Sequence, residues 1–110
     1  MRFTVEVTHR AESDVSRVLQ WLRERSLRGA AHWLGRYHRA LKTLATDPRG
    51  FGTAPESLDC GEDLREISFK TRYGNVYRLV FVIRSNVVHV LRLRTSGQPL
   101  LSPTEIDIPE

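Results

Sequence analysis

The sequence predicts a small α+β domain in which an antiparallel helical hairpin packs on one face of a β-sheet. Apolar residues recur at helical spacing along residues 9–26 and again from about Arg28 to Thr46, with a short break in the pattern at Ser26 to Gly29. Period-two patterns predict one strand before the helices and a three-stranded antiparallel meander after them, at residues 2–8, 64–69, 75–84 and 87–94. With 110 residues and no repeat, the chain is expected to be one domain, residues 1–110.

Local signals justify the ends of these elements. In the first strand, Phe3, Val5 and Val7 share one face, and Thr8 can cap the helix that follows. Asp47-Pro48 ends the second helix, because the residue before a proline is driven out of helical geometry.

The connections are expected to be irregular or tightly turned. Residues 48–61 hold three glycines and two prolines without periodicity, so they predict a loop. Ser85-Asn86 predicts a short hairpin turn in which Asn86 tolerates a positive φ. Residues 96–110 either close with a short turn or form a loose tail.

Composition excludes several classes of protein. The single cysteine, Cys60, allows no intrachain disulfide and no metal site of paired cysteines. No apolar run approaches the ~20 residues of a membrane span, and the N-terminus lacks a basic start followed by an apolar stretch. We therefore expect a cytoplasmic protein with no metal, no cofactor and no membrane partner.

The charge of the chain rests on arginine. The 17 basic and 13 acidic residues give a net charge of +4, and all basic residues except Lys42 and Lys70 are arginine. The planar guanidinium fork suits bidentate contact with phosphate or carboxylate, although a GC-rich genome would also favour arginine codons. A basic domain predicts an acidic partner, either nucleic acid or an acidic protein segment.

Side chains alternate across a strand, and this alternation assigns residues to faces. One face of the strand 75–84 is wholly apolar and should meet the helices: Tyr77, Leu79, Phe81 and Ile83. In the strand 87–94, alternation places Val88 and Val90 with Arg92 and Arg94 on one face. It places His89, Leu91 and Leu93 with Val87 on the other.

An unpaired guanidinium costs several kcal/mol in a dry core. The sheet face away from the helices is therefore expected to be an open cationic surface carrying Arg78, Arg92 and Arg94. The pattern does not decide on which face Arg65 lies. The alternative is that these cations are solvated or ion-paired, Arg78 with Glu66 and Arg65 with Asp63.

Several short stretches, taken in their order and spacing, resemble the RelE/ParE superfamily of toxins from bacterial type II toxin–antitoxin modules. The stretches are APE at 54–56, LREISF at 64–69, YRLVF at 77–81 and VHVLRLR at 88–94. They are most similar to the plasmid-stabilisation branch, and the resemblance extends from about Phe3 to Glu105. It implies a cytoplasmic growth inhibitor with a curved antiparallel sheet, neutralised by a cognate antitoxin and bound to operator DNA only through the antitoxin complex.

The resemblance also implies site residues. Arg78 matches the sheet arginine that grips phosphate in RelE-like nucleases, and Arg65 matches a basic residue of the preceding strand. The candidate catalytic residues are Arg78, Arg65 and Arg94. The candidate contacts to the target or its phosphates are Arg92, Arg94, Lys70 and Arg72. The candidate antitoxin contacts on the second helix are Arg36, Arg39 and Trp33.

The sequence departs from the nuclease pattern near the end of the last strand. Thr95 stands where many relatives have a histidine, and Gln98 stands where they have an arginine. Cleavage of RNA by its 2′-OH needs a base, a cation and an acid. Arginine carries protons poorly because its pKa exceeds ~12. The remaining candidates are Tyr73, in a turn, and His89, which is expected to be partly buried.

These departures favour a ParE-like toxin that inhibits DNA gyrase or another target without cutting RNA. One alternative is a RelE-like, ribosome-dependent mRNA endoribonuclease. The other is a degenerate toxin that still binds its antitoxin but does not inhibit growth.

Overall fold

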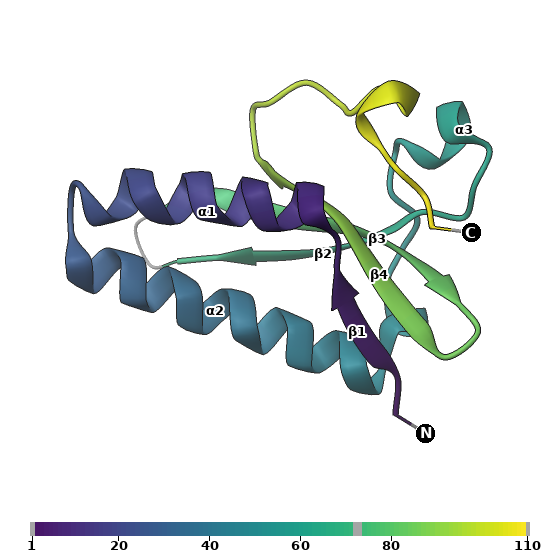
Figure 1. Ribbon diagram of the computed structural model, residues 1–110, viewed down its shortest axis with the longest axis horizontal. Helices are drawn as coiled ribbons and strands as arrows, with labels where there is room; N and C mark the ends of the chain where they lie inside the picture. Colours follow the sequence, from purple (N-terminus) through teal and green to yellow (C-terminus); the bar gives the residue numbers. More distant parts are fainter. Residues whose placement is uncertain (1, 72–73, 110) are drawn as a thin grey trace.

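A four-stranded sheet carries the helical hairpin on one face, and the predicted fold class is confirmed (Figure 1). The computed structural model describes residues 2–71 and 74–109. The helices are α1 (His9–Arg23), α2 (Leu27–Thr46) and the single turn α3 (Ser57–Cys60). The strands are β1 (Thr4–Val7), β2 (Arg65–Lys70), β3 (Val76–Arg84) and β4 (Val87–Thr95). Two 3-10 turns are η1 (Pro48–Gly50) and η2 (Pro103–Glu105).

The strand order in the sheet is β1-β4-β3-β2. Strands β2, β3 and β4 form the expected antiparallel meander, but β1 pairs with β4 in parallel. The sheet is therefore mixed, which corrects the fully antiparallel sheet that the resemblance implied. A parallel pair needs a long connection, and the whole chain between β1 and β4 provides it.

Side-chain caps define the N-terminal ends of both hairpin helices, as the sequence predicted for α1. The Thr8 hydroxyl accepts a hydrogen bond from the Ala11 N–H at 3.4 Å, and the Ser26 hydroxyl accepts one from the Gly29 N–H at 2.9 Å. Helix α2 ends at Thr46, before Asp47-Pro48. None of the described helices is long and apolar enough to cross a membrane.

The main core lies between the sheet and the hairpin. Tyr77, Leu79 and Phe81 of β3 are buried there, as alternation predicted. Trp33 of α2 is 1 % exposed and stacks on Tyr37 with a ring-centroid distance of 5.4 Å. Aromatic rings from α2 and the meander therefore join the two layers.

A bulge in β4 changes which of its residues face the helices. Val80 of β3 pairs with Arg92, whereas the next residue, Phe81, pairs with Val90, so Leu91 is an extra residue in β4. The predicted alternation is therefore wrong in this strand. The helix-side core contains Val88, Val90 and Leu93, and Leu91 packs on the opposite face.

The opposite face of the sheet is covered by a second, smaller core. The end of the chain and the segment before β2 pack on it, and Leu101 and Ile106 are 2 % and 7 % exposed. In Figure 1 the C-terminal segment lies beside α3 on this side of the sheet. Of the two alternatives for residues 96–110, the short turn is present as η2, and the residues around it are docked rather than loose. The predicted loop 48–61 contains η1 and α3.

The β3–β4 turn has its left-handed residue at Ser85, with φ 55, and not at Asn86 as the sequence predicted. The left-handed region costs an ordinary residue about 1 kcal/mol, whereas glycine adopts it freely.

We expect Ser85→Gly to raise the free energy of unfolding by about 0.5–1 kcal/mol, because it removes this backbone strain. Urea denaturation would measure the change. Asn86→Gly is the matched control in the same turn and should give no gain, since Asn86 has no positive φ. Equal gains at both positions would contradict the observed turn geometry.

Candidate functional site

The sheet face away from the helices is called the arginine face here, after Arg78, Arg92 and Arg94. Arg78 and Arg94 are direct cross-strand neighbours, and Arg92 lies opposite Val80 of the second core. The face of these three residues agrees with the sequence analysis. Their surroundings do not, because the tail and the segment before β2 cover much of the face that was expected to be open.

Arg78 forms a buried ion pair at the centre of the arginine face. Its guanidinium donates two hydrogen bonds to the carboxylate of Glu56, one of them at 2.9 Å, and a third to Glu66 at 3.3 Å. The side chain of Arg78 is 16 % exposed and that of Glu56 is 0 % exposed. Glu56 also accepts the backbone N–H of Leu101 at 3.0 Å. Arg78 is therefore a structural cation, and the view that it lies exposed is wrong.

The pairing of Arg78 with Glu66 that the sequence offers as an alternative is present, whereas no sequence signal points to Glu56. Glu56 lies in the APE stretch, within an irregular segment that gives no periodic signal of burial. The hydrogen bond that Arg78 donates to Glu56 raises the pKa of Arg78 above its already high ordinary value, so Arg78 stays charged at any pH at which the protein is folded.

Arg92 is held in a second buried network at the edge of β4. Its guanidinium donates hydrogen bonds to both oxygens of Asp14 in α1, at 2.7 and 3.0 Å, and to the Glu105 carbonyl at 2.8 Å. Asp14 also accepts the Leu93 N–H at 3.0 Å and pairs with Arg17. Strand β1 ends beside Val90, so among the described residues the rest of β4 has no strand on that edge. There the carboxylate of Asp14 accepts the Leu93 N–H that a neighbouring strand would otherwise bind.

Arg65 is not part of the arginine face. It lies opposite Phe81, whose ring belongs to the helix-side core, so the register places Arg65 on the other side of the sheet from Arg78. It donates to the carbonyl of Phe51 at 2.8 Å and to Asp63 at 3.2 Å. The structure therefore does not bring together the three candidate catalytic residues, and the alternative pairing with Asp63 is present.

Arg94 and Lys70 lie at the uncovered end of the arginine face. Arg94 donates to the carbonyl of Pro99, and its Nε–H is buried without a hydrogen-bond partner among residues 2–71 and 74–109. Lys70 is exposed and lies opposite Val76, which is 40 % exposed. Arg72 lies outside the described residues. Of the candidate target contacts, Lys70 is therefore exposed and Arg94 is partly exposed, whereas Arg92 is mostly buried in its network with Asp14.

The candidate antitoxin contacts divide in the same way. Arg36 and Arg39 are exposed on α2, as the prediction requires. Trp33 is 1 % exposed and packs against Tyr37 and Phe69, so in this structure it belongs to the core.

The described titratable groups do not assemble an acid–base pair beside Arg94. His89 is 14 % exposed, with its Nδ1 3.5 Å from a carboxylate oxygen of Glu6. Because of the bulge, it shares the side of Leu91 and not that of Leu93. Burial, and then the charge of Glu12, raises the pKa of Tyr37 to about 12, on the helix side of the sheet.

The thiol of Cys60 is also unsuited to such chemistry. Burial, assisted by nearby carboxylates, raises the pKa of the Cys60 thiol. Tyr73 lies outside the described residues. Among the described residues, no group of three or more His, Cys, Asp and Glu side chains could hold a metal ion.

The fold and the arginine face define a small basic α+β domain, and comparison with known proteins gives its family. Residues 5–99 match the family described as the ParE toxin of the type II toxin–antitoxin system parDE. The chain therefore belongs to the ParE toxin family, and membership implies an antitoxin partner. No curated protein matches the chain significantly.

A solved structure supports the fold. The chain is similar to an arginine double mutant of the E. coli toxin RelE in the free state, at 15% identity and a TM-score of 0.56. The match covers 88% of this chain and 86% of that chain. At this identity the likeness concerns the fold alone.

We expect Arg78→Ala to lower the free energy of unfolding by about 3–5 kcal/mol, because it leaves the buried carboxylate of Glu56 without its cation. Denaturant titration would measure this loss. Arg84→Ala is the control on the same strand: its pair with Glu62 is 37% exposed on both sides and should matter by about 1 kcal/mol or less. A fully stable Arg78→Ala protein would show that the pair is dispensable.

The Glu56 pair also predicts a pH dependence. Burial raises the pKa of Glu56, but the hydrogen bonds from Arg78 and the Leu101 N–H outweigh it and hold the pKa below its usual value. The resulting stabilisation is complete above the unfolded pKa of ~4.3 and is lost as the pH falls through the folded pKa.

Glu56→Gln should therefore be less stable than the wild type at neutral pH, by roughly 1–3 kcal/mol, and should lose less stability on acidification. Urea unfolding at a series of pH values would measure both effects. Parallel pH profiles for the two proteins would exclude Glu56 as the source of the acid sensitivity.

Proposed function

We propose that this chain inhibits growth through a protein target, with DNA gyrase as the first candidate, and that it does so without cutting RNA. The observation that carries the proposal is the commitment of Arg78 and Arg92 to the buried carboxylates of Glu56 and Asp14. A nuclease would need these cations free to neutralise a phosphate in the transition state.

Arg94 supports the same proposal, because it forms no ion pair with residues 2–71 and 74–109 and no acid–base pair is assembled beside it among those residues. Thr95 and Gln98 stand at the positions where many relatives have a histidine and an arginine. Here the Gln98 side-chain oxygen accepts the Thr95 N–H at 2.7 Å, so Gln98 shapes the turn after β4. Charge stabilisation without an acid and a base gives only part of the catalysis of RNA cleavage.

The uncovered end of the arginine face has the character of a protein contact. Lys70 and Arg94 provide positive charge. Val76, at the start of β3 and opposite Lys70, provides an exposed apolar side chain. An acidic surface with an apolar neighbour would complement it. We propose that the antitoxin contacts the exposed Arg36 and Arg39 of α2, and that operator DNA is bound through the antitoxin complex.

Controlled expression in a bacterium tests this function. We expect the wild type to arrest growth with intact mRNA by primer extension, and the purified protein to inhibit DNA supercoiling by gyrase. Arg94→Ala should weaken the inhibition by roughly tenfold or more, since it removes a sheet cation that forms no ion pair within residues 2–71 and 74–109. Arg84→Ala is the matched control and should remain inhibitory.

Other outcomes would identify the alternatives. Codon-spaced cuts in mRNA, lost in Arg94→Ala, would make the chain a RelE-like, ribosome-dependent endoribonuclease. No growth arrest by a folded wild-type protein would favour a degenerate toxin that only binds its antitoxin.

A further inference from the structure

We infer that copies of this chain associate head to tail, with the α3 turn of one copy seated in a groove along α2 of the next. The α3 knob is defined by Leu58 and Asp59. The α2 groove is a hollow of about 630 Å³ that α2 forms with β1. This inference does not depend on the proposed function.

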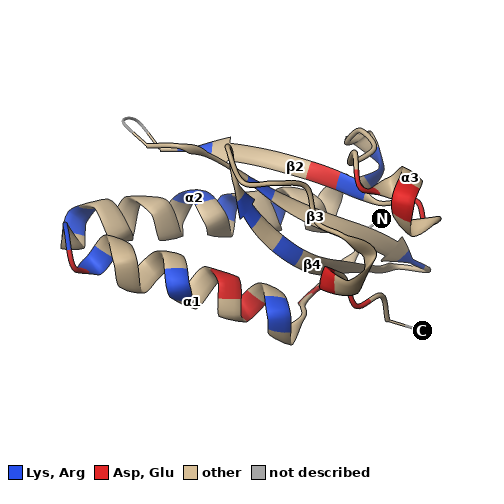
Figure 2. Ribbon diagram, turned by 90° about the horizontal axis from the view of Figure 1, so that it is seen from above, with Lys and Arg blue, Asp and Glu red and all other residues tan. Residues whose placement is uncertain are grey.

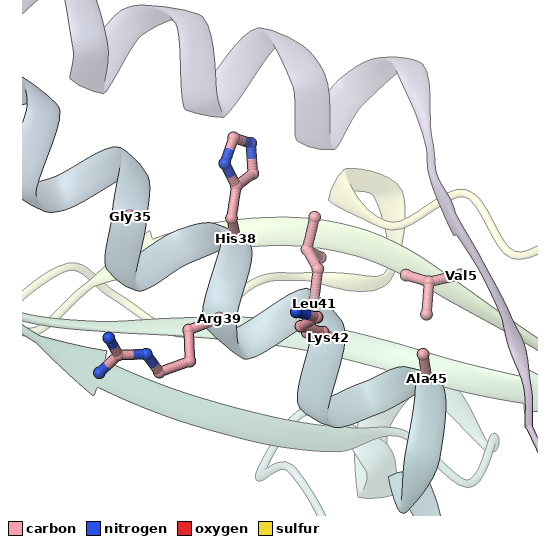
Figure 3. A pocket seen from close by; sticks show the side chains of 7 residues that line it. All are labelled: Val5, Gly35, His38, Arg39, Leu41, Lys42 and Ala45. Atoms are coloured by element: carbon pink, nitrogen blue, oxygen red, sulfur yellow. The ribbon is translucent and has the colours of Figure 1, made fainter.

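The lining of the α2 groove combines apolar side chains with the cations Arg39 and Lys42 (Figure 3). Its residues follow one stripe of α2, because 35, 38, 42 and 45 recur at helical spacing. Lys42 and Arg39 are exposed, and neither forms an ion pair within the described part of the chain. The lining consists of Val5, Gly35, His38, Arg39, Leu41, Lys42 and Ala45.

The α3 knob presents an apolar side chain that the fold leaves without cover. Leu58 is 91 % exposed, more than any other large hydrophobic residue described. The turn is held rigidly, because Gly61 ends it in the left-handed conformation and the Ser57 hydroxyl accepts the Leu64 N–H at 3.2 Å. These contacts hold the knob in a defined conformation in the unbound chain, which lowers the backbone ordering that binding would cost.

Charge makes the two surfaces complementary. The carboxylate of Asp59 lies next to Leu58 and forms no ion pair with residues 2–71 and 74–109. Figure 2 shows acidic residues on α3 and basic residues along both long helices. An apolar residue beside a carboxylate fits an apolar groove whose lining includes Lys42 and Arg39.

The geometry requires two copies. Helix α2 packs on the helix side of the sheet, whereas the segment that carries α3 packs on the arginine face, so one chain cannot fill its own groove. The two surfaces differ, so each contact leaves a free knob and a free groove, which is the heterologous mode that builds chains of copies. The contact is small, and the association is expected to be weak and dependent on concentration and salt.

Sedimentation equilibrium of the full chain tests this inference. The average mass of the wild type should rise with concentration and fall toward the monomer in high salt. Leu58→Ser and Lys42→Glu should each weaken the association by roughly tenfold or more. Leu27→Ser is the control, since Leu27 is also highly exposed, at 76 %, but lies outside both surfaces. Circular dichroism would establish that every variant is folded.

A mixing experiment separates this mode from other kinds of self-association. Leu58→Ser keeps an intact groove and Lys42→Glu keeps an intact knob, so an equimolar mixture should form one-to-one dimers and nothing larger. A wild type that stays monomeric at millimolar concentration would overturn the inference and leave the groove to an acidic segment of a foreign partner. Association that both variants retain, or a mixture without dimers, would overturn it as well.

Discussion

The ion pair between Glu56 and Arg78 is the interaction on which the second half of the fold depends. A carboxylate with no exposure to solvent stays charged only if a cation and hydrogen-bond donors replace its lost water. Glu56 obtains the guanidinium of Arg78 from β3 and the backbone N–H of Leu101 from the tail. One side chain therefore fixes three segments that are distant in sequence, and the second core closes around them.

A second buried acid, Asp14, plays the corresponding role at the open edge of β4. Asp14 ties α1 to β4 by accepting hydrogen bonds from Arg92 and from the unpaired edge of the strand at Leu93. It also prevents that edge from pairing with another chain. Two arginines that sequence alone would assign to a binding surface are thus used to join the layers of the domain. The sheet cations available to a partner are those that form no ion pair within residues 2–71 and 74–109, namely Arg94 and Lys70.

Sequence predicted what local physics decides and missed what long-range contacts decide. The Thr8 cap, the end of α2 before Pro48 and the apolar face of β3 follow from signals within a few residues, and the structure has all three. The bulge at Leu91 follows from no local signal, and it reverses the alternation that placed Leu91 with Leu93. The burial of Glu56 depends on a partner 22 residues away and on the docked tail, so neither composition nor periodicity could show it.

The arginines of the sheet differ in what an incoming anion would have to displace. An anion at Arg78 would leave the carboxylate of Glu56 buried and unpaired, which costs several kcal/mol. At Arg94 an anion would displace the carbonyl of Pro99 and, among the described residues, no carboxylate. The difference exceeds what one charge-assisted hydrogen bond contributes, roughly 1.5–3 kcal/mol. Recognition of an acidic target on this face should therefore begin at Arg94, while Arg78 stays paired with Glu56.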